Sequence, residues 1–167
     1  MTERLLRLFK SDDAAAIREL TRATLDAYHR RFGETAGRAA DITELADLAK
    51  TGSVFVAQQG ADIVGAIGYT PPGVIEHPLF SRSWALIRML VVAAPVDHSA
   101  VTSSLIAHCV AQAESDKAEA ISVYSWPSDI LFEPDFRRAG FREASIAPEL
   151  HGNLHALLLR QLGPKSD

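Results

Sequence analysis

The hydrophobic and polar positions of this chain follow two periods, one typical of helices and one typical of strands. In residues 14–28 apolar or partly apolar side chains recur every three or four positions, which predicts an amphipathic helix: Ile17, Leu20, Thr24, Leu25 and Tyr28. The preceding Ser11, Asp12 and Asp13 predict its start, because short oxygen-bearing side chains cap free N–H groups and acids suit the positive end of a helix dipole.

A second helical stripe crosses residues 99–114 and is formed by Val101, Leu105, Ile106, Cys109, Val110 and Ala113. Just before it, residues 84–92 are almost continuously apolar, which predicts a central strand buried on both faces. Shorter strands are predicted at 5–9, 54–57, 63–69, 121–125, 141–146 and 155–159, and shorter helices at 43–50 and 133–139.

The order of these elements predicts an α/β fold. Its first half is rich in hairpins and its second half contains a β-α-β unit, so we expect a mixed, partly antiparallel central sheet flanked by helices. The length of 167 residues fits one domain, which we place at 1–162. The remaining residues, 163–167, offer nothing to bury and predict a flexible tail.

Composition narrows the function classes. The net charge of −4 argues against a nucleic-acid partner, which would require a concentrated basic face. The single cysteine, Cys109, excludes an intrachain disulfide and lies on an apolar helix stripe, so we expect it in the core. No leader or membrane-spanning run is evident, which favours a cytoplasmic protein without a membrane partner. No His, Cys and acidic cluster has metal-ligand spacing, so we expect no metal site.

Four segments, taken in order, resemble the GNAT superfamily of acetyl-CoA-dependent N-acyltransferases. Residues 89–95, Met-Leu-Val-Val-Ala-Ala-Pro, resemble that family's fourth strand, and residues 97–102 occupy the place of its Gln/Arg-x-x-Gly-x-Gly/Ala turn. Residues 136–141, Phe-Arg-Arg-Ala-Gly-Phe, resemble its C-terminal aromatic-x-x-x-Gly-Phe signature. The hairpin strand that begins at residues 63–65, Ile-Val-Gly, adds to the match, which in element order covers almost the whole chain.

The resemblance implies a GNAT-like fold and transfer of an acetyl group from acetyl-CoA to a primary amine, by direct attack through a tetrahedral intermediate. The acceptor is expected to be a small-molecule or peptide amine. Relatives commonly dimerise, but the sequence leaves open whether this chain forms a homodimer. The backbone of the fourth strand would contact the pantetheine arm and polarise the thioester carbonyl. The implied coenzyme-binding residues are Leu90, Val91, Val92, Asp97, His98, Ser99, Ala100, Val101, Thr102, Ser103 and Phe136.

The phosphate-binding turn departs from the family pattern. Asp97 stands where Gln or Arg is usual, and His98 and Ala100 replace common glycines. A helix N-terminus still offers free N–H groups and a positive dipole end to a pyrophosphate, and nearby hydroxyls add donors. Alternatively, Asp97 caps the helix itself and fills the anion site with its own carboxylate.

The acid and base of the reaction are open in this sequence. Many family members protonate the leaving thiolate with a tyrosine, but the matching Phe136 has no ionisable group. Tyr124 and Ser128 are the candidate acids, although strands favour tyrosines in any case. Glu76, with His77 beside it, is the candidate base, and its alternative is an ordinary exposed loop acid.

Two functions therefore follow from the sequence. One is an N-acetyltransferase. The other is a non-catalytic domain of the same fold that binds another ligand or a protein partner, which the altered turn and Phe136 both favour.

Overall fold

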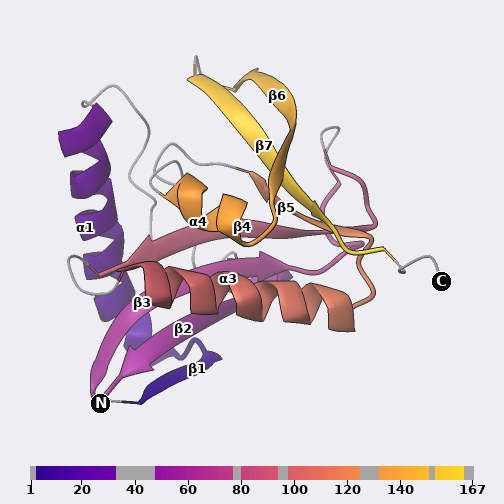
Figure 1. Ribbon diagram of the computed structural model, residues 1–167. Coiled ribbons are helices and arrows are strands. Elements are labelled where there is room, and N and C mark those ends of the chain that lie inside the picture. The colour runs from indigo at the N-terminus through magenta and orange to yellow at the C-terminus, as the bar shows by residue number, and fades with distance from the viewer. Residues whose placement is uncertain are drawn as a thin grey trace.

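The computed structural model describes residues 3–32, 48–76, 80–93, 98–124, 132–150 and 153–163 (Figure 1). Its helical elements are the 3-10 turn η1 (Ser11–Asp13), α1 (Ala14–Phe32), α3 (His98–Ser115) and α4 (Glu133–Arg138). Its strands are β1 (Arg4–Leu8), β2 (Ser53–Gln59), β3 (Asp62–Thr70), β4 (Trp84–Val92), β5 (Ala120–Tyr124), β6 (Arg142–Leu150) and β7 (Asn153–Gln161). No helix in these ranges is both long and apolar enough to cross a membrane.

The strands form one seven-stranded sheet in the order β1-β2-β3-β4-β5-β7-β6. Neighbouring strands are antiparallel except β4 and β5, which are parallel and joined through α3. The predicted mixed α/β sheet is therefore confirmed, with its one parallel pair at the β-α-β unit.

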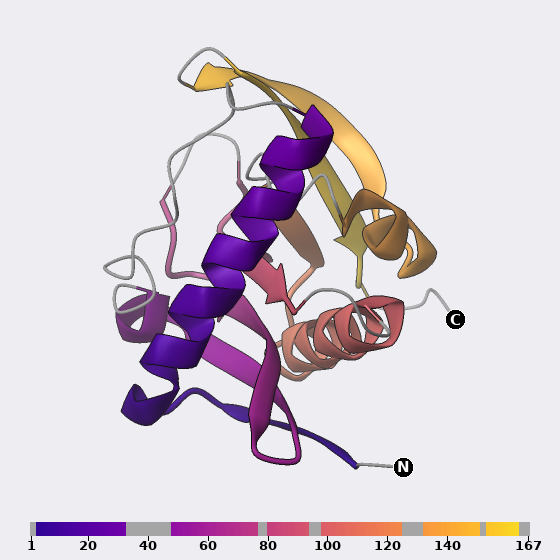
Figure 2. The ribbon, with the colours of Figure 1, turned by 90° about the vertical axis from the view of Figure 1, so that its left-hand side faces the viewer.

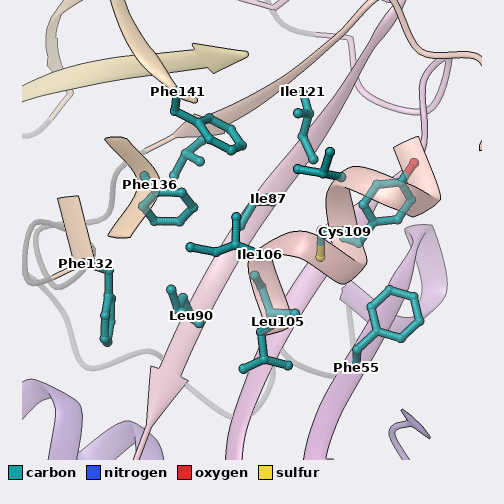
Figure 3. Close-up of a cluster of buried hydrophobic side chains, with 14 of the residues drawn as sticks. Phe55, Ile87, Leu90, Leu105, Ile106, Cys109, Ile121, Phe132, Phe136 and Phe141 are labelled. Carbon is teal, nitrogen blue, oxygen red and sulfur yellow. The ribbon is translucent and has the colours of Figure 1, made fainter. Parts of the chain in front are cut away.

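The two long helices cover opposite faces of the sheet (Figures 1 and 2). On one face, Ile17 and Leu20 of α1 pack against Val56, Ala66 and Val91. On the other face, the stripe predicted for α3 meets side chains of β2 to β5, α4 and the β7 hairpin, as Figure 3 shows. Cys109 lies inside this second cluster, where burial raises the pKa of its thiol, so its predicted place in the core is confirmed.

The C-terminal hairpin is longer than the sequence predicts. The sequence predicts strands at 141–146 and 155–159, with Pro148 in the turn between them, but β6 continues through this proline to Leu150. Because β6 is the outer strand of the sheet, a missing proline N–H does not break a ladder on both sides. The register also shifts between Ala147 and Leu150, which is where such an irregularity is tolerated. For the helix predicted at 43–50, only its end lies within the described residues, and residues 48–51 are helical.

The start of α1 is tied to the edge strand β1 by a buried carboxylate. Asp13 accepts two hydrogen bonds from the Arg7 guanidinium, at 2.8 and 2.9 Å, and one from the Lys10 N–H at 2.8 Å. The Arg7 hydrogen bonds, aided by the Lys10 N–H, hold the pKa of Asp13 below its usual value.

Asp13→Asn is expected to lower the free energy of unfolding by about 1–3 kcal/mol at pH 7, because it leaves the Arg7 charge half-buried and unpaired. Since the pKa of Asp13 is lowered on folding, its stabilisation is present above the unfolded-state value of about 3.9 and is lost as pH falls below it. Urea unfolding at a series of pH values should therefore show the two proteins converging in acid. Asp12→Asn, at an exposed neighbour, is the matched control, and an equal loss in both variants would contradict the account.

Candidate functional site

The parallel strands β4 and β5 pair over only part of their length. Their ladder runs from Trp84 opposite Ala120 to Ile87 opposite Val123. β4 then continues to Val92, whereas β5 ends at Tyr124, which pairs with Leu157 of β7 on its other side. We call the stretch of β4 beyond Ile87 the β4 splay. In the described part of the chain, no strand pairs with its β5-facing edge.

A β-bulge lies where the splay begins. Gly68 of β3 is opposite Met89, but Tyr69 is opposite Ile87, so Arg88 is the extra residue on β4. Side chains before and after the bulge show its effect: Ile87 and Leu90 both pack on the α3 face, while Met89 packs on the α1 face. The bulge thus re-aims the strand at the point where it separates from β5.

Backbone directions in the splay follow from one hydrogen bond. The Ala93 N–H donates to the Val64 carbonyl at 2.9 Å, toward β3. Because polar groups alternate along a strand, the groups of Val91 face β3, and those of Val92 and Leu90 face the open edge. Val92 is met there by the Thr24 hydroxyl of α1, 3.4 Å from its nitrogen and 3.5 Å from its oxygen. Leu90 is left with its N–H and C=O directed into the splay.

The N-terminus of α3 lies beside α4 (Figure 1). The helix begins at His98, so its first-turn N–H groups have no partner within the helix. The Ser99 hydroxyl donates to Asp135 at 3.2 Å and accepts from the Arg138 guanidinium at 2.9 Å. Arg138 also pairs directly with Asp135, and 62% of its side chain is exposed. A hydroxyl and a solvent-facing cation therefore stand at the positive end of α3, beside a buried carboxylate.

Among the predicted coenzyme-binding residues of α3 and α4, three have buried side chains. Phe136 is completely buried and packs edge-on against Phe141, with ring centroids 5.3 Å apart. Val101 and Thr102 are also buried. A coenzyme at this surface would therefore contact the backbone of the turn and not these side chains. Phe136 is therefore a core residue of this fold.

Glu76 lies far from the β4 splay, where a general base would be needed. Its carboxylate is exposed and accepts a hydrogen bond from Arg82 at 2.6 Å. The same loop is held at the start of β4, because the Gly73 N–H donates to the Arg82 carbonyl at 2.7 Å. From Trp84 to Leu90 the strand rises about 20 Å, so the expected base is at the opposite end of β4. The alternative interpretation, an exposed loop acid, is the one the structure supports.

The other predicted residues are placed only in part. Tyr124 is the last residue of β5 and so stands at the mouth of the splay, by its backbone position. Ser99, Ala100 and Ser103 lie in the first two turns of α3, and His98 begins it. Asp97 and Ser128 lie outside the described residues, so their roles stay predictions.

Three residues at the site were not predicted. Arg88 carried a signal, because it is the lone charge in an otherwise apolar strand. Asp135 and Arg138 carried none, since their meeting with Ser99 joins residues 36 and 39 positions apart. Among the described residues, no group of three or more His, Cys, Asp or Glu side chains is arranged to hold a metal ion.

No family model and no curated protein matches this sequence. Solved structures do. A GNAT-family acetyltransferase assigned to Desulfovibrio desulfuricans superposes with a TM-score of 0.73 at 17% identity, over 95% of this chain and 99% of that one. This chain has the GNAT fold. A GNAT-family acetyltransferase from Brucella melitensis in complex with acetyl-CoA has a TM-score of 0.66 at 19% identity, covering 100% and 93%.

A third GNAT-fold structure, an acetyltransferase from Salmonella typhimurium with its cofactor acetyl-CoA, has a TM-score of 0.67 at 16% identity, covering 96% of this chain and 93% of that one. The likeness extends over nearly the full length in each case. The splay, the bulge and the exposed start of α3 are thus features of a GNAT-fold domain that is at most 19% identical in sequence to these three structures.

Proposed function

We propose that this protein is an acetyl-CoA-dependent N-acetyltransferase. The observation that carries the proposal is the β4 splay, whose Leu90 backbone groups face an edge without a strand partner. An extended amide-containing chain such as pantetheine is suited to that edge, because it can pair with strand backbone groups. Acetyl-CoA is present in two of the similar structures, which supports this choice of ligand.

The start of α3 would hold the pyrophosphate. First-turn N–H groups and the helix dipole favour an anion whatever the neighbouring side chains. The Arg138 guanidinium is exposed beside this N-terminus and has further N–H groups to donate, whereas the Ser99 hydroxyl proton is already donated to Asp135. The donors present therefore fit the coenzyme, although the glycines of the family turn are missing.

The chemistry needs a donor for the thioester oxygen. The Leu90 N–H is fixed in the sheet and directed into the splay, so it would stabilise negative charge on that oxygen during attack. The neutral amine nitrogen bonds to the carbonyl carbon and the carbon–sulfur bond breaks. The nitrogen loses one proton as the amide forms, and the leaving thiolate takes up one proton, so CoA leaves as the thiol. Phe136 does not supply that proton, since it has no ionisable group and is buried. Tyr124, at the mouth of the splay, and Ser128 are the residues we propose for this step.

A second candidate function has its own observation. The buried carboxylate of Asp135 lies 3.2 Å from the Ser99 hydroxyl, next to the N-terminus where phosphate would bind. A carboxylate of the chain placed beside the helix N-terminus disfavours a phosphate there, which fits a non-catalytic domain that binds another ligand. Arg138 offsets this charge, which is why we favour the enzyme.

The test of the enzyme is thiol release. Purified protein is incubated with acetyl-CoA and a panel of primary amines, and free CoA is measured with a thiol reagent. Cys109 is buried, so it should add little signal. We expect amine-dependent release, and mass spectrometry should find the amine acetylated. Release at the rate of the amine-free control across the whole panel would favour the non-catalytic domain.

A further inference from the structure

Arg88 is a half-buried cation without a partner. Among the described residues it makes no hydrogen bond or ion pair, whereas Arg7, Arg82 and Arg137 are paired with acids. Arg4 of the edge strand β1 also has a buried Nε without a partner, but it lies far from the splay in the strand order. Removing a guanidinium partly from water is costly unless an anion or an acceptor compensates. An uncompensated guanidinium in this position therefore favours an anionic ligand as its partner.

The bulge decides which face Arg88 occupies. In a bulge the extra residue and the one after it project to the same side of the sheet. Met89, the residue after, packs against the cluster beneath α1, whereas Ile87 packs toward α3. Arg88 therefore stands on the α1 face, at the first residue of the splay.

A second, independent observation lies on the same face. The Thr70 hydroxyl is buried, with 1% of the residue exposed, and has no hydrogen-bond partner. Thr70 is opposite Leu86, two residues before Arg88 on β4. On the other side of Leu86 stands Ser122, also buried, whose hydroxyl makes only a long 3.4 Å bond to the Ala85 carbonyl. A row of hydroxyls thus flanks the strand that carries the unpaired arginine.

We propose that Arg88 binds the carboxylate of the acceptor, so that the acceptor is a small amine that carries its own carboxylate, as an amino acid does. This rests on acetyl transfer at the same splay. The coenzyme would reach the splay from the start of α3. The acceptor would then approach from the opposite face of the sheet, which α1 covers (Figure 2). Arg88 and Leu90 are two residues apart, about 7 Å along the strand, a distance that suits an anion close to the reacting amine. A guanidinium pairs with a carboxylate through two parallel hydrogen bonds, which a lysine cannot reproduce.

The test compares amino acids with the amines that lack their carboxylate, such as phenylalanine with phenethylamine and alanine with ethylamine. For the best pair we expect the wild-type kcat/KM to favour the amino acid at least about tenfold. Arg88→Gln should lower kcat/KM for the amino acid about 10- to 100-fold, mainly through KM, and leave the plain amine within about threefold. For the amino acid, the kcat/KM of Arg88→Lys should lie between the values for wild type and Arg88→Gln. Arg22→Gln, at an exposed arginine of α1, should change neither.

Direct binding separates this inference from the proposed function. Amino acids are titrated into the ¹⁵N-labelled protein without coenzyme, with wild type and Arg88→Gln compared by NMR. Transfer to plain amines as efficient as to amino acids, or an equal loss for both in folded Arg88→Gln, overturns the carboxylate site and leaves the acetyltransferase intact. If no amine is acetylated, binding of amino acids to wild type but not to Arg88→Gln still supports the site. If no amine is acetylated and no amino acid binds, both the carboxylate site and the proposed acetyltransferase function are overturned.

Discussion

Leu90→Pro is expected to lower kcat about 100- to 1000-fold, the usual cost of removing one oxyanion donor. Proline has no N–H, and the Leu90 N–H faces the splay and not β3, so the change removes the proposed donor without removing a ladder hydrogen bond. Turnover is measured with the best acceptor from the amine panel, at a temperature where circular dichroism shows the variant folded.

Leu90→Ala is the matched control for packing. Leu90 is buried in the cluster of Figure 3, so both substitutions leave a cavity that costs about 2–5 kcal/mol of stability. Only the proline also removes the N–H. Affinity for CoA, which has no thioester carbonyl, should be similar in the two variants, because both keep the Leu90 carbonyl that would accept from pantetheine. Equal kcat values for the alanine and proline variants would show that another group stabilises the oxyanion.

Gly52→Ala is expected to destabilise the protein by about 3 kcal/mol or more, with a fall in Tm of about 6–12 °C. A Cβ at this position would lie 2.0 Å from the Tyr69 carbonyl oxygen and 3.0 Å from the Thr70 Cα, and backbone atoms of a central sheet cannot move aside easily. The glycine ends the helical segment of residues 48–51, through its N–H bond to the Leu48 carbonyl, and brings the chain down onto β3.

Gly163→Ala is the control for this second effect, because nothing lies within 4 Å of a Cβ built there. We expect its stability to stay within about 0.5 kcal/mol of wild type. Thermal unfolding by circular dichroism measures both variants. An unchanged Tm for Gly52→Ala would mean that residues 48–52 do not approach β3 as closely as described.

Sequence patterns predicted most of the fold, because hydrophobic periodicity reports directly on burial. The α3 stripe, the central position of β4 and the burial of Cys109 all follow from it. The longer β6 did not, since Pro148 reads as a turn until the strand is known to lie at the sheet edge. Edge or centre is a property of the assembled sheet, which local sequence does not encode.

The site was predicted less completely than the fold. The resemblance predicted residues 90–92 and 97–103 as coenzyme-binding. It did not show which backbone groups face the splay, because that depends on the bulge at Arg88. Glu76 remains untested as a base, but the structure places its carboxylate beside Arg82 at the start of β4, far along the strand from the splay. The contact of Ser99 with Arg138 arises from packing of α4 against α3, which no local pattern records.

Calorimetric titration of the protein with acetyl-CoA, with CoA as the companion ligand, tests the central claim most directly. The β4 splay and the start of α3 should together bind the coenzyme with a Kd in the micromolar range, whether or not the right acceptor has been found. No heat of binding at millimolar acetyl-CoA would contradict the account and would favour the non-catalytic domain, with the Asp135 carboxylate beside Ser99 at the start of α3.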